Sequence, residues 1–240
     1  DSDNFDVDFG AAVALETDPV AMSVVNRVAL NDITVSVLDS AGNRVSNDTS
    51  TVTPAVTGLA LTGSPVSAVG GVATFSGLVV SGVVGSYDLG FSAAGLASAT
   101  TSIALTHGAA ASVELTVSAA ANNGALLETQ PVLRILDADG NLVDSGNESD
   151  QTVELVVSPG TLSGTTAISA SAGIATFSGI ALVGEIGSNT LTGRIYSPQT
   201  FASNQVISLG FGAATKLTLE TAAAGAASGI ALTTQPTLRL

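Results

Sequence analysis

The 240-residue sequence contains no cysteine and no tryptophan, and lysine, histidine and methionine each occur once. Without cysteine, no disulfide holds the fold and no thiol acts as a nucleophile or metal ligand. Carbohydrate binding by aromatic stacking has little support, because tryptophan is absent and the two tyrosines, Tyr87 and Tyr196, are not at matched positions. These absences leave few side chains for catalysis.

Positive charge is also scarce, with six basic against 20 acidic residues and a net charge of −14 at pH 7. Nucleic acids and anionic membrane surfaces attract basic faces, so we expect neither as a partner. No apolar run approaches the roughly 18 residues that span a bilayer, so we expect no membrane insertion within this segment. Residues 1–4 are acidic where an export signal is basic, so an exported protein would carry this segment in processed form.

What the chain does contain is an internal repeat. Residues 71–78 read GVATFSGL, and residues 173–180, which lie 102 positions later, read GIATFSGI. A second motif, Phe-Gly-Ala-Ala at 9–12, returns with His in place of Phe at 107–110 and unchanged at 211–214. Matches at about one domain length predict tandem modules.

The repeat offsets predict the domain organisation. Residues 9–106 and 107–210 each form a full module, and residues 211–240 supply the first strands of a third, incomplete module. Residues 1–8 correspond to the last strand of a preceding module. We expect a window from a longer array; the alternative is completion of the partial end by another chain.

Short alternating apolar segments predict the fold class. Val113, Leu115 and Val117 alternate with the polar residues Glu114 and Thr116, and Val153, Leu155 and Val157 also stand at every second position. Seven short strands in about 100 residues predict an all-β fold of tandem immunoglobulin-like antiparallel β-sandwiches. No helix is expected, although residues 20–30 have room for one or two helical turns.

Four positions of the repeat are predicted to hold the core and its turns. Phe75 and Phe177 are the central core residues, because so few other large aromatic side chains are available. Gly42 and Gly140 belong to Asp-x-x-Gly-Asn turns between apolar runs, where glycine adopts a positive φ without a Cβ clash.

Three motifs in fixed order resemble the bacterial Ig-like repeats of the invasin and intimin type. They are Asp-x-x-Gly-Asn-x-Val, then Gly-x-Ala-Thr-Phe-x-Gly-Leu, then Gly-Ser-x-x-Leu. In this chain they occupy 39–45, 71–78 and 85–89, then 137–143, 173–180 and 187–191, with Ile180 in place of the final Leu of the middle motif. The resemblance covers both full repeats and implies tandem sandwiches of the kind found in adhesin stalks, surface layers and extracellular filaments. It carries fold and turn positions, and no catalytic or cofactor-binding residue comes with it.

No catalytic residue is expected. The single histidine, His107, stands where the other copies have Phe9 and Phe211, which favours a packing role at a module boundary. A Ser/His/Asp triad in each repeat is excluded, because the first repeat has no histidine. The acid shared by both repeats in a matched motif, Asp39 or Asp137, lies at a turn.

The segment Asp137-Ala138-Asp139-Gly140-Asn141 has two interpretations. It reads as a hairpin turn, and it also resembles the start of a calcium loop, with Asp137, Asp139 and Asn141 as ligands and Glu148 at the late bidentate position. Residues 142–147 follow the ligand pattern poorly, which favours the turn. No other cofactor is expected.

Asn47 and Asn147 each begin an Asn-x-Ser/Thr sequence in the same loop of the two repeats. In an exported protein these are candidate glycosylation sites. A Lys–Asn isopeptide crosslink is rejected, because Lys216 has no amine at the matching positions of the other copies.

Together these features predict a non-enzymatic, extracellular array at the cell surface. We expect the stalk or a building block of a surface adhesin or filament, with neighbouring modules of the same array and homo-assembly as its partners. Two alternatives stay open: a subunit of a surface-layer lattice, and a glycan-binding module attached to a larger secreted protein.

Overall fold

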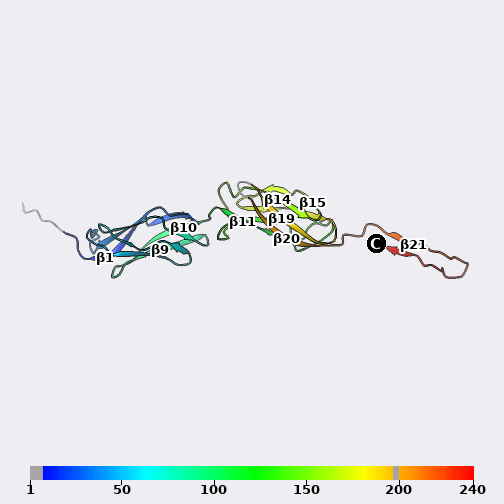
Figure 1. The fold of residues 1–240 in the computed structure, drawn as a ribbon, viewed down its shortest axis with the longest axis horizontal. Coiled ribbons are helices and arrows are strands. Elements are labelled where there is room, and N and C mark those ends of the chain that lie inside the picture. The colour runs from blue at the N-terminus through cyan, green and yellow to red at the C-terminus, as the bar shows by residue number, and fades with distance from the viewer. Residues whose placement is uncertain (1–7, 197–199) are drawn as a thin grey trace, which may run out of the picture. The chain divides into compact units, whose positions relative to one another are not determined.

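The computed structural model describes residues 8–196 and 200–240, and these residues form strands, turns and loops but no helix (Figure 1). None of the described residues therefore belongs to a helix long and apolar enough to cross a bilayer. Apart from Asp8, the strand predicted for residues 1–8 lies outside the described residues.

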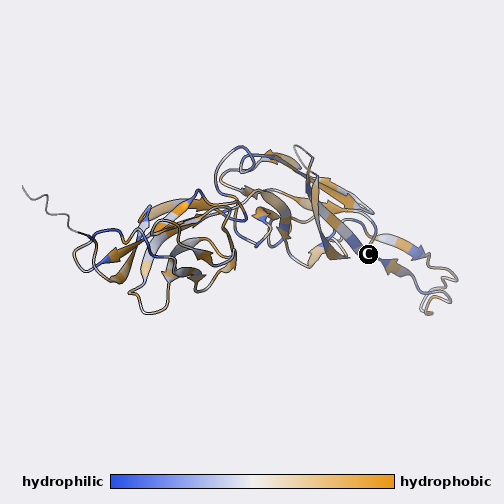
Figure 2. Ribbon diagram, turned by 60° about the vertical axis from the view of Figure 1, so that its left-hand side comes forward, coloured by the Kyte–Doolittle hydropathy of each residue, from blue (hydrophilic) through white to orange (hydrophobic). Residues whose placement is uncertain are grey.

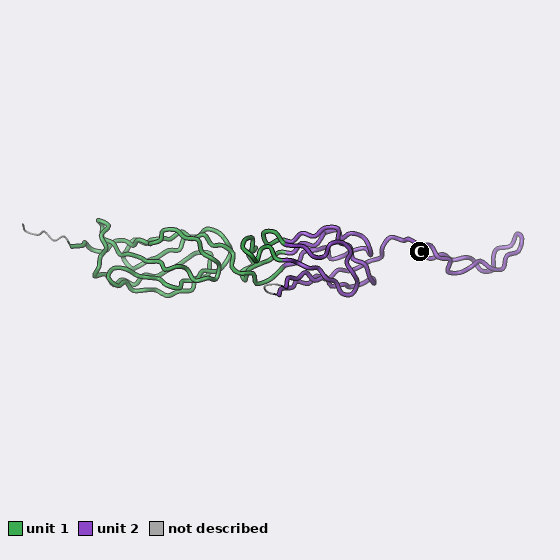
Figure 3. The backbone as a smooth tube through the Cα atoms, turned by 90° about the horizontal axis from the view of Figure 1, so that it is seen from above, with its two compact units in different colours: residues 1–113, 134–151, 170–174 green, residues 114–133, 152–169, 175–240 purple. Residues whose placement is uncertain are grey.

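The chain divides into two compact units (Figure 3). The first comprises residues 1–113, 134–151 and 170–174, and the second comprises residues 114–133, 152–169 and 175–240. These units divide the second repeat between them, so they do not test the module boundaries expected from the sequence. Those boundaries stay predictions.

The described part of the first repeat contains ten strands. They are β1 (Ala12–Asp18), β2 (Ala21–Val25), β3 (Ile33–Asp39), β4 (Thr51–Val56), β5 (Ala60–Thr62), β6 (Val66–Ser67), β7 (Val72–Phe75), β8 (Val79–Ser81), β9 (Gly85–Ser92) and β10 (Ala99–Thr106). A three-stranded sheet has the order β1-β3-β7, and a five-stranded sheet has the order β2-β10-β9-β4-β6. Strands β5 and β8 form a separate antiparallel pair.

The second repeat has the same arrangement, with each strand number raised by ten. Its strands are β11 (Ala110–Thr116), β12 (Ala120–Asn122), β13 (Val132–Asp137), β14 (Thr152–Ser158), β15 (Thr161–Ser163), β16 (Ala167–Ser169), β17 (Ile174–Thr176), β18 (Ala181–Val183), β19 (Gly187–Ile195) and β20 (Phe201–Gly210). The sheets are β11-β13-β17, β12-β20-β19-β14-β16 and β15-β18. This common strand order confirms the predicted all-β, Ig-like sandwich fold.

After Gly210 the chain forms one more antiparallel pair, β21 (Thr218–Thr221) with β22 (Thr237–Arg239). Thr218 lies opposite Arg239, just as Glu16 lies opposite Ser36 in the pairing of β1 with β3. The repeat offsets align these two residue pairs with each other. The last segment therefore begins with the same strand pairing as the first repeat.

Alternation along the strands explains why these segments form sandwiches. In β3 the inward residues Ile33, Val35 and Val37 are fully buried, and the residues between them are partly exposed. A period of two places every second side chain on the core face of a sheet. Figure 2 shows much of the hydrophobic colour on the strands.

Aromatic side chains occupy the centre of the first core. Phe75 is 2% exposed, and its ring centroid lies 5.0 Å from that of Phe91, at an interplanar angle of 49°. Phe177, at the matching position of the second repeat, is equally buried. Tilted ring pairs at this distance are favourable beyond the area that they bury.

The repeated octapeptide begins with glycine for a steric reason. Gly71 and Gly173 have φ values of 74° and 76°, and a Cβ atom at either would clash with the carbonyl oxygen of Val45 or Val143 respectively. Val45 and Val143 are themselves buried. The glycine therefore lets the octapeptide strand start directly beside the core.

The prediction of seven strands per repeat is incomplete. Strands β2, β6 and β8, with their counterparts β12, β16 and β18, are two to five residues long and were missed. The helical turns considered for residues 20–30 are also wrong, because β2 lies there and pairs in parallel with β10. Such short strands carry almost no periodic signal, and they depend on partners distant in sequence.

Truncation of a central phenylalanine tests the core. We expect Phe75→Ala and Phe177→Ala each to lower the free energy of unfolding of its own repeat by about 3–5 kcal/mol, through lost burial and the cavity left behind. Urea denaturation followed by circular dichroism measures the loss. Phe211→Ala is the matched control, because Phe211 is 80% exposed, and an equal loss in all three variants would contradict the assignment.

Candidate functional site: a polar junction around Asp137

The Asp-x-x-Gly-Asn turn of the second repeat is built around a buried carboxylate. Asp137 occupies the next inward position of β13 after Leu133 and Ile135, and it is 3% exposed. Its Oδ1 accepts hydrogen bonds from the backbone N–H groups of Asp139 and Asn141, both at 2.9 Å. The Asn141 side-chain amide also donates to Oδ1 and Oδ2, at 3.1 and 3.0 Å.

The first repeat contains the same turn around Asp39. The Oδ1 atom accepts from the backbone N–H groups of Ala41 at 2.9 Å and Asn43 at 2.8 Å. The Oδ2 atom accepts from the N–H of Gly10 at 2.8 Å, and in the second repeat the N–H of Gly108 donates to Oδ2 of Asp137 at 2.9 Å. Each carboxylate thus joins its turn to the segment that leads into the repeat.

The two turn glycines are present for their backbone conformation. Gly42 and Gly140 have φ values of 83° and 81°, in the left-handed region. A Cβ atom at either position would meet nothing within 4 Å, so crowding does not select glycine there. The hairpin closes with the N–H of Asp137 donating to the carbonyl of Asn141 at 2.8 Å.

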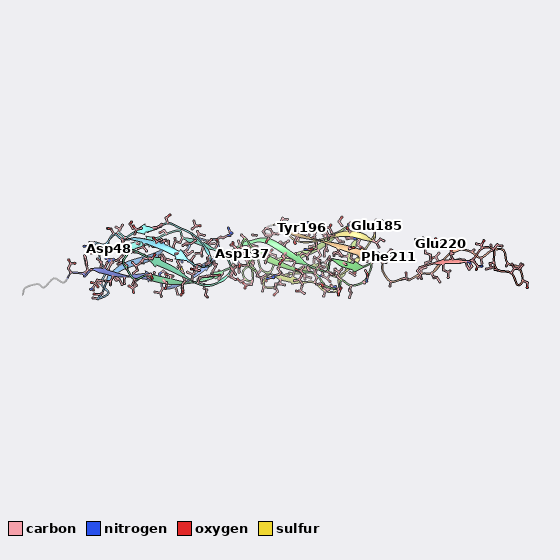
Figure 4. The ribbon with its side chains drawn as sticks, turned by 90° about the horizontal axis from the view of Figure 1, so that it is seen from below. Asp48, Asp137, Glu185, Tyr196, Phe211 and Glu220 are labelled. Carbon is pink, nitrogen blue, oxygen red and sulfur yellow. The ribbon has the colours of Figure 1, made fainter. Side chains whose placement is uncertain are left out.

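Within the first compact unit, two loops of the first repeat hold the Asp137 turn. The side-chain amide of Asn26 donates to Oδ2 of Asp137 at 3.0 Å. The Asn141 amide donates to the carbonyl of Gly82 at 2.9 Å, and the backbone N–H of Val84 donates to Oδ1 of Asn141 at 3.0 Å. Asn26 is 2% exposed. Figure 4 labels Asp137.

An ion pair extends this contact. The guanidinium of Arg27 donates from Nε and Nη2 to the two carboxylate oxygens of Asp139, each at 2.7 Å. Arg27 has a φ of 63°, a left-handed conformation that is uncommon for a residue with a side chain. We call this set of residues the polar junction: Asn26, Arg27, Gly82, Val84, Asp137, Asp139 and Asn141.

Hydrogen bonding keeps the carboxylates of both turns ionised. Burial raises the pKa of Asp137, but the hydrogen bonds donated by Gly108, Asn141 and Asn26 outweigh it, so its pKa lies well below the usual range. Hydrogen bonds from the backbone N–H groups of Gly10 and Asn43 lower the pKa of Asp39 to about 2. The hydrogen bond from Arg27 likewise lowers the pKa of Asp139.

Gly108 explains the glycine of the repeated Phe/His-Gly-Ala-Ala motif. A Cβ atom at Gly108 would lie 2.9 Å from the backbone carbonyl oxygen of Asn26, closer than real Cβ contacts. The backbone of the second repeat must approach the loop of the first repeat this closely for the Gly108 N–H to reach Asp137. At this copy of the motif, the glycine therefore marks the junction as well as the start of a repeat.

The candidate calcium ligands have separate partners in this geometry. Asp137 accepts from N–H donors on both oxygens, and Asp139 pairs with Arg27. Glu148 accepts from the backbone N–H of Ala110 at 2.8 Å. Among the described residues, no group of three or more histidines and acids is placed to hold a metal ion. The arrangement of donors around Asp137 favours the turn interpretation.

His107 makes polar contacts at the start of the second repeat. Its Nδ1 lies 2.9 Å from the carbonyl oxygen of Gly108, and its Nε2 lies 2.7 Å from Oγ of Ser145 and 3.5 Å from Oδ1 of Asp144. In a catalytic triad the carboxylate and the serine contact opposite ring nitrogens. Here both contact Nε2, so these residues fix the ring without forming a triad.

The two candidate glycosylation sites lie on exposed loops. Asn47 and Asn147 are both exposed, whereas Ser149, the hydroxyl residue of the second site, is buried and donates to the carbonyl of Gly146 at 2.8 Å. Exposure of the asparagines is compatible with modification, which stays a prediction.

Sequence reasoning missed the first-repeat half of the junction. Asn26, Arg27 and Gly82 lie in segments that share little sequence with their counterparts around Asn123 and Gly184. The signal in the sequence was that Asn26 and Gly82 recur at the matching positions of the second repeat, as Asn123 and Gly184. Asparagine and glycine are common in loops, so their recurrence does not by itself indicate a contact.

Comparisons with known proteins give structural similarity only. No protein-family model and no curated protein matches the sequence. Among solved structures, the chain is similar to the Escherichia coli adhesin FdeC, with a TM-score of 0.40 and 15% identity over 82% of this chain and 63% of the FdeC chain. It is also similar to the Yersinia pseudotuberculosis adhesin InvE, with a TM-score of 0.34 and 16% identity over 90% of this chain and 65% of the InvE chain. A third similar structure is the D0-D1 domain of intimin, with a TM-score of 0.29 and 15% identity over 82% of this chain and 98% of that chain.

The chain thus spans less than two thirds of the FdeC and InvE chains. At TM-scores this low, the similarities carry no argument about function. The fold assignment rests on the strand order of the two repeats, which share one topology.

Acid should weaken the Asp39 and Asp137 turns. Both carboxylates have a lowered pKa in the folded protein, so the unfolded chain binds more protons as the pH falls from about 4 to about 2. The stability they contribute is complete above that window and falls as the pH falls through it. Asp39 loses its contribution as the pH reaches about 2, whereas Asp137, whose pKa is lower, keeps part of its contribution at that pH. We expect Asp39→Asn and Asp137→Asn each to flatten the fall of the urea midpoint over this window, and the double variant to flatten it further. Slopes equal to that of the unchanged protein would contradict the assignment.

Proposed function

We propose that this chain is part of an extracellular structural array of tandem Ig-like repeats, serving as the stalk or a building block of a surface adhesin or filament. Its partners are neighbouring repeats of the same array, and it acts without catalysis or a cofactor. The observation that carries this proposal is the polar junction, in which loops of one repeat bind the turn of the next.

The chemistry of the junction suits a mechanical role. Five hydrogen bonds join the loops at 26–27 and 82–84 to the turn at 137–141, and two of them form a bidentate ion pair. Charge-assisted and bidentate hydrogen bonds fix orientation more strictly than apolar contact does. A stalk needs such fixation between repeats, because a free linker would let the chain collapse.

The composition is compatible with an extracellular place for this array. The net charge of −14 and the exposed loops around Asn47 and Asn147 suit a chain that is surrounded by water along its length. The absence of cysteine makes the fold independent of oxidising or reducing conditions.

Loss of the junction should uncouple the repeats. We expect amides of the two repeats in the 240-residue chain to show one shared rotational correlation time in ¹⁵N relaxation. The double variant Asn26→Ala, Arg27→Ala removes the amide and guanidinium donors and should give each repeat a shorter, separate value. Asn123→Ala, at the matching position of the second repeat, is the control that leaves the coupling unchanged. Separate correlation times in the unchanged chain would overturn the proposed fixation.

Location tests the proposed role directly. Antibodies raised against the 240-residue chain should label fibres or projections outside the native cells in immunogold electron micrographs. Labelling confined to the cell interior would overturn the proposal. Labelling of a continuous regular sheet would instead assign the chain to a surface-layer lattice.

A further inference from the structure

The loop at residues 122–127 of the second repeat is a copy of the loop at residues 25–30 that holds the Asp137 turn. The backbone N–H of Asn26 donates to Thr106 at 3.1 Å, and that of Asn123 donates to Gly210 at 3.1 Å. The N–H of Arg27 donates to Val80 at 3.0 Å, and that of Gly124 donates to Leu182 at 2.9 Å. The two loops therefore have the same backbone path.

The side chains that matter are also repeated. The Asn26 amide donates to the Gly82 carbonyl at 3.1 Å and accepts from the Gly82 N–H at 3.2 Å. The Asn123 amide donates to the Gly184 carbonyl at 2.6 Å and accepts from the Gly184 N–H at 3.3 Å. In the first repeat the Asn26 amide has a second acceptor, Asp137. Among the described residues, the Asn123 amide has no such second acceptor.

The segment after Gly210 corresponds to the segment around Gly108 that leads into the second repeat. A Cβ atom at Gly212 would clash with the carbonyl oxygen of Asn123, as one at Gly108 would with the carbonyl oxygen of Asn26. Beyond it, β21 and β22 pair in the register of β1 and β3. In both full repeats, the strand that corresponds to β22 ends in the Asp-x-x-Gly-Asn turn.

We propose that Asn123, Gly184 and Ile186 form a docking surface for the Asp-x-x-Gly-Asn turn of a further Ig-like repeat, entered through residues 211–214. The occupant is specified by chemistry: a buried aspartate to accept from the Asn123 amide, and an asparagine to bond with the Gly184 carbonyl and the Ile186 N–H. This inference rests on the proposed function, because it extends the junction to the next repeat of the array.

The proposed docking surface lacks a charge that its counterpart in the first repeat has. Gly124 stands at the position of Arg27 and shares its left-handed conformation, with a φ of 76°. In the first repeat, Ala41 stands at the position of Asp139. The ion pair is therefore specific to the Asp137 turn, whereas an asparagine stands at the matching position of both repeats, as Asn26 and Asn123. A surface pair of this kind adds selectivity that salt screens.

The test extends the 240-residue chain beyond Leu240 with a copy of residues 136–210, because Leu240 aligns with Ile135. The readout is hydrogen exchange of the Ile186 backbone amide by NMR. We expect exchange about tenfold slower in the extended chain than in the 240-residue chain, owing to the new hydrogen bond. Asn123→Ala should abolish this slowing, and Asn26→Ala should leave it unchanged. The Val84 amide in the existing junction serves as the positive control.

A second extension guards against a failure of the first to fold. It carries residues 38–106, with the Asp39 turn, in place of residues 136–210.

Gly124→Arg should slow Ile186 exchange further in the first extension, where the appended Asp139 is present, and not in the second, which has Ala41. The added slowing should disappear at high salt.

Each outcome decides a separate point. A folded extension with unchanged Ile186 exchange overturns the docking surface and leaves the array proposal standing. Failure of both extensions to fold overturns the docking surface and the array proposal together. Head-to-tail dimers of the 240-residue chain that Asn123→Ala abolishes would assign the surface to a second copy and overturn the choice of occupant.

Discussion

A buried carboxylate at the end of a central strand is the constraint on which the rest of this structure depends. Ile33, Val35 and Val37 alternate inward along β3, and the next inward position is Asp39. The strand period buries a charge there, and a buried charge is tolerated only with full hydrogen bonding. For Asp39, the turn and the Gly10 segment supply the donors. For Asp137, the turn and Gly108 supply backbone N–H groups, and the Asn26 side-chain amide donates as well.

The core and the junction are therefore parts of one arrangement. Leu133 and Ile135 place β13 in its core, and the same strand delivers Asp137 to the Asn26 loop. A change in the core that shifted β13 along its axis would also withdraw the carboxylate from its donors. In the proposed array, fixation between repeats would thus derive from packing within them, without a separate interface of large apolar side chains.

The sequence contained enough information for the fold and for half of the site. The octapeptide at 71–78, the Asp-x-x-Gly-Asn turns and the two phenylalanines are local patterns, and the structure places them in one topology repeated twice. The short strands β2 and β12 were missed because their hydrogen-bond partners are distant in sequence. Asn26 was missed because its function exists only beside Asp137, 111 residues away. The sequence showed the glycine of Phe/His-Gly-Ala-Ala only as part of a repeated motif. The steric reason for glycine at Gly108 is the nearby Asn26 carbonyl, which only the structure shows.

Several of the polar contacts are made to main-chain atoms: the Gly82 carbonyl and the N–H groups of Val84 and Gly108. Main-chain partners persist whatever side chains surround them, so neighbouring positions are free to diverge. Unequal recombination that deletes or duplicates a whole repeat would keep these main-chain partners at every remaining boundary, whereas the ion pair would form only where Arg27 meets Asp139. A gene encoding such a protein could therefore lengthen or shorten its product in steps of one repeat, with fewer compensating mutations than a boundary built from side chains alone would need.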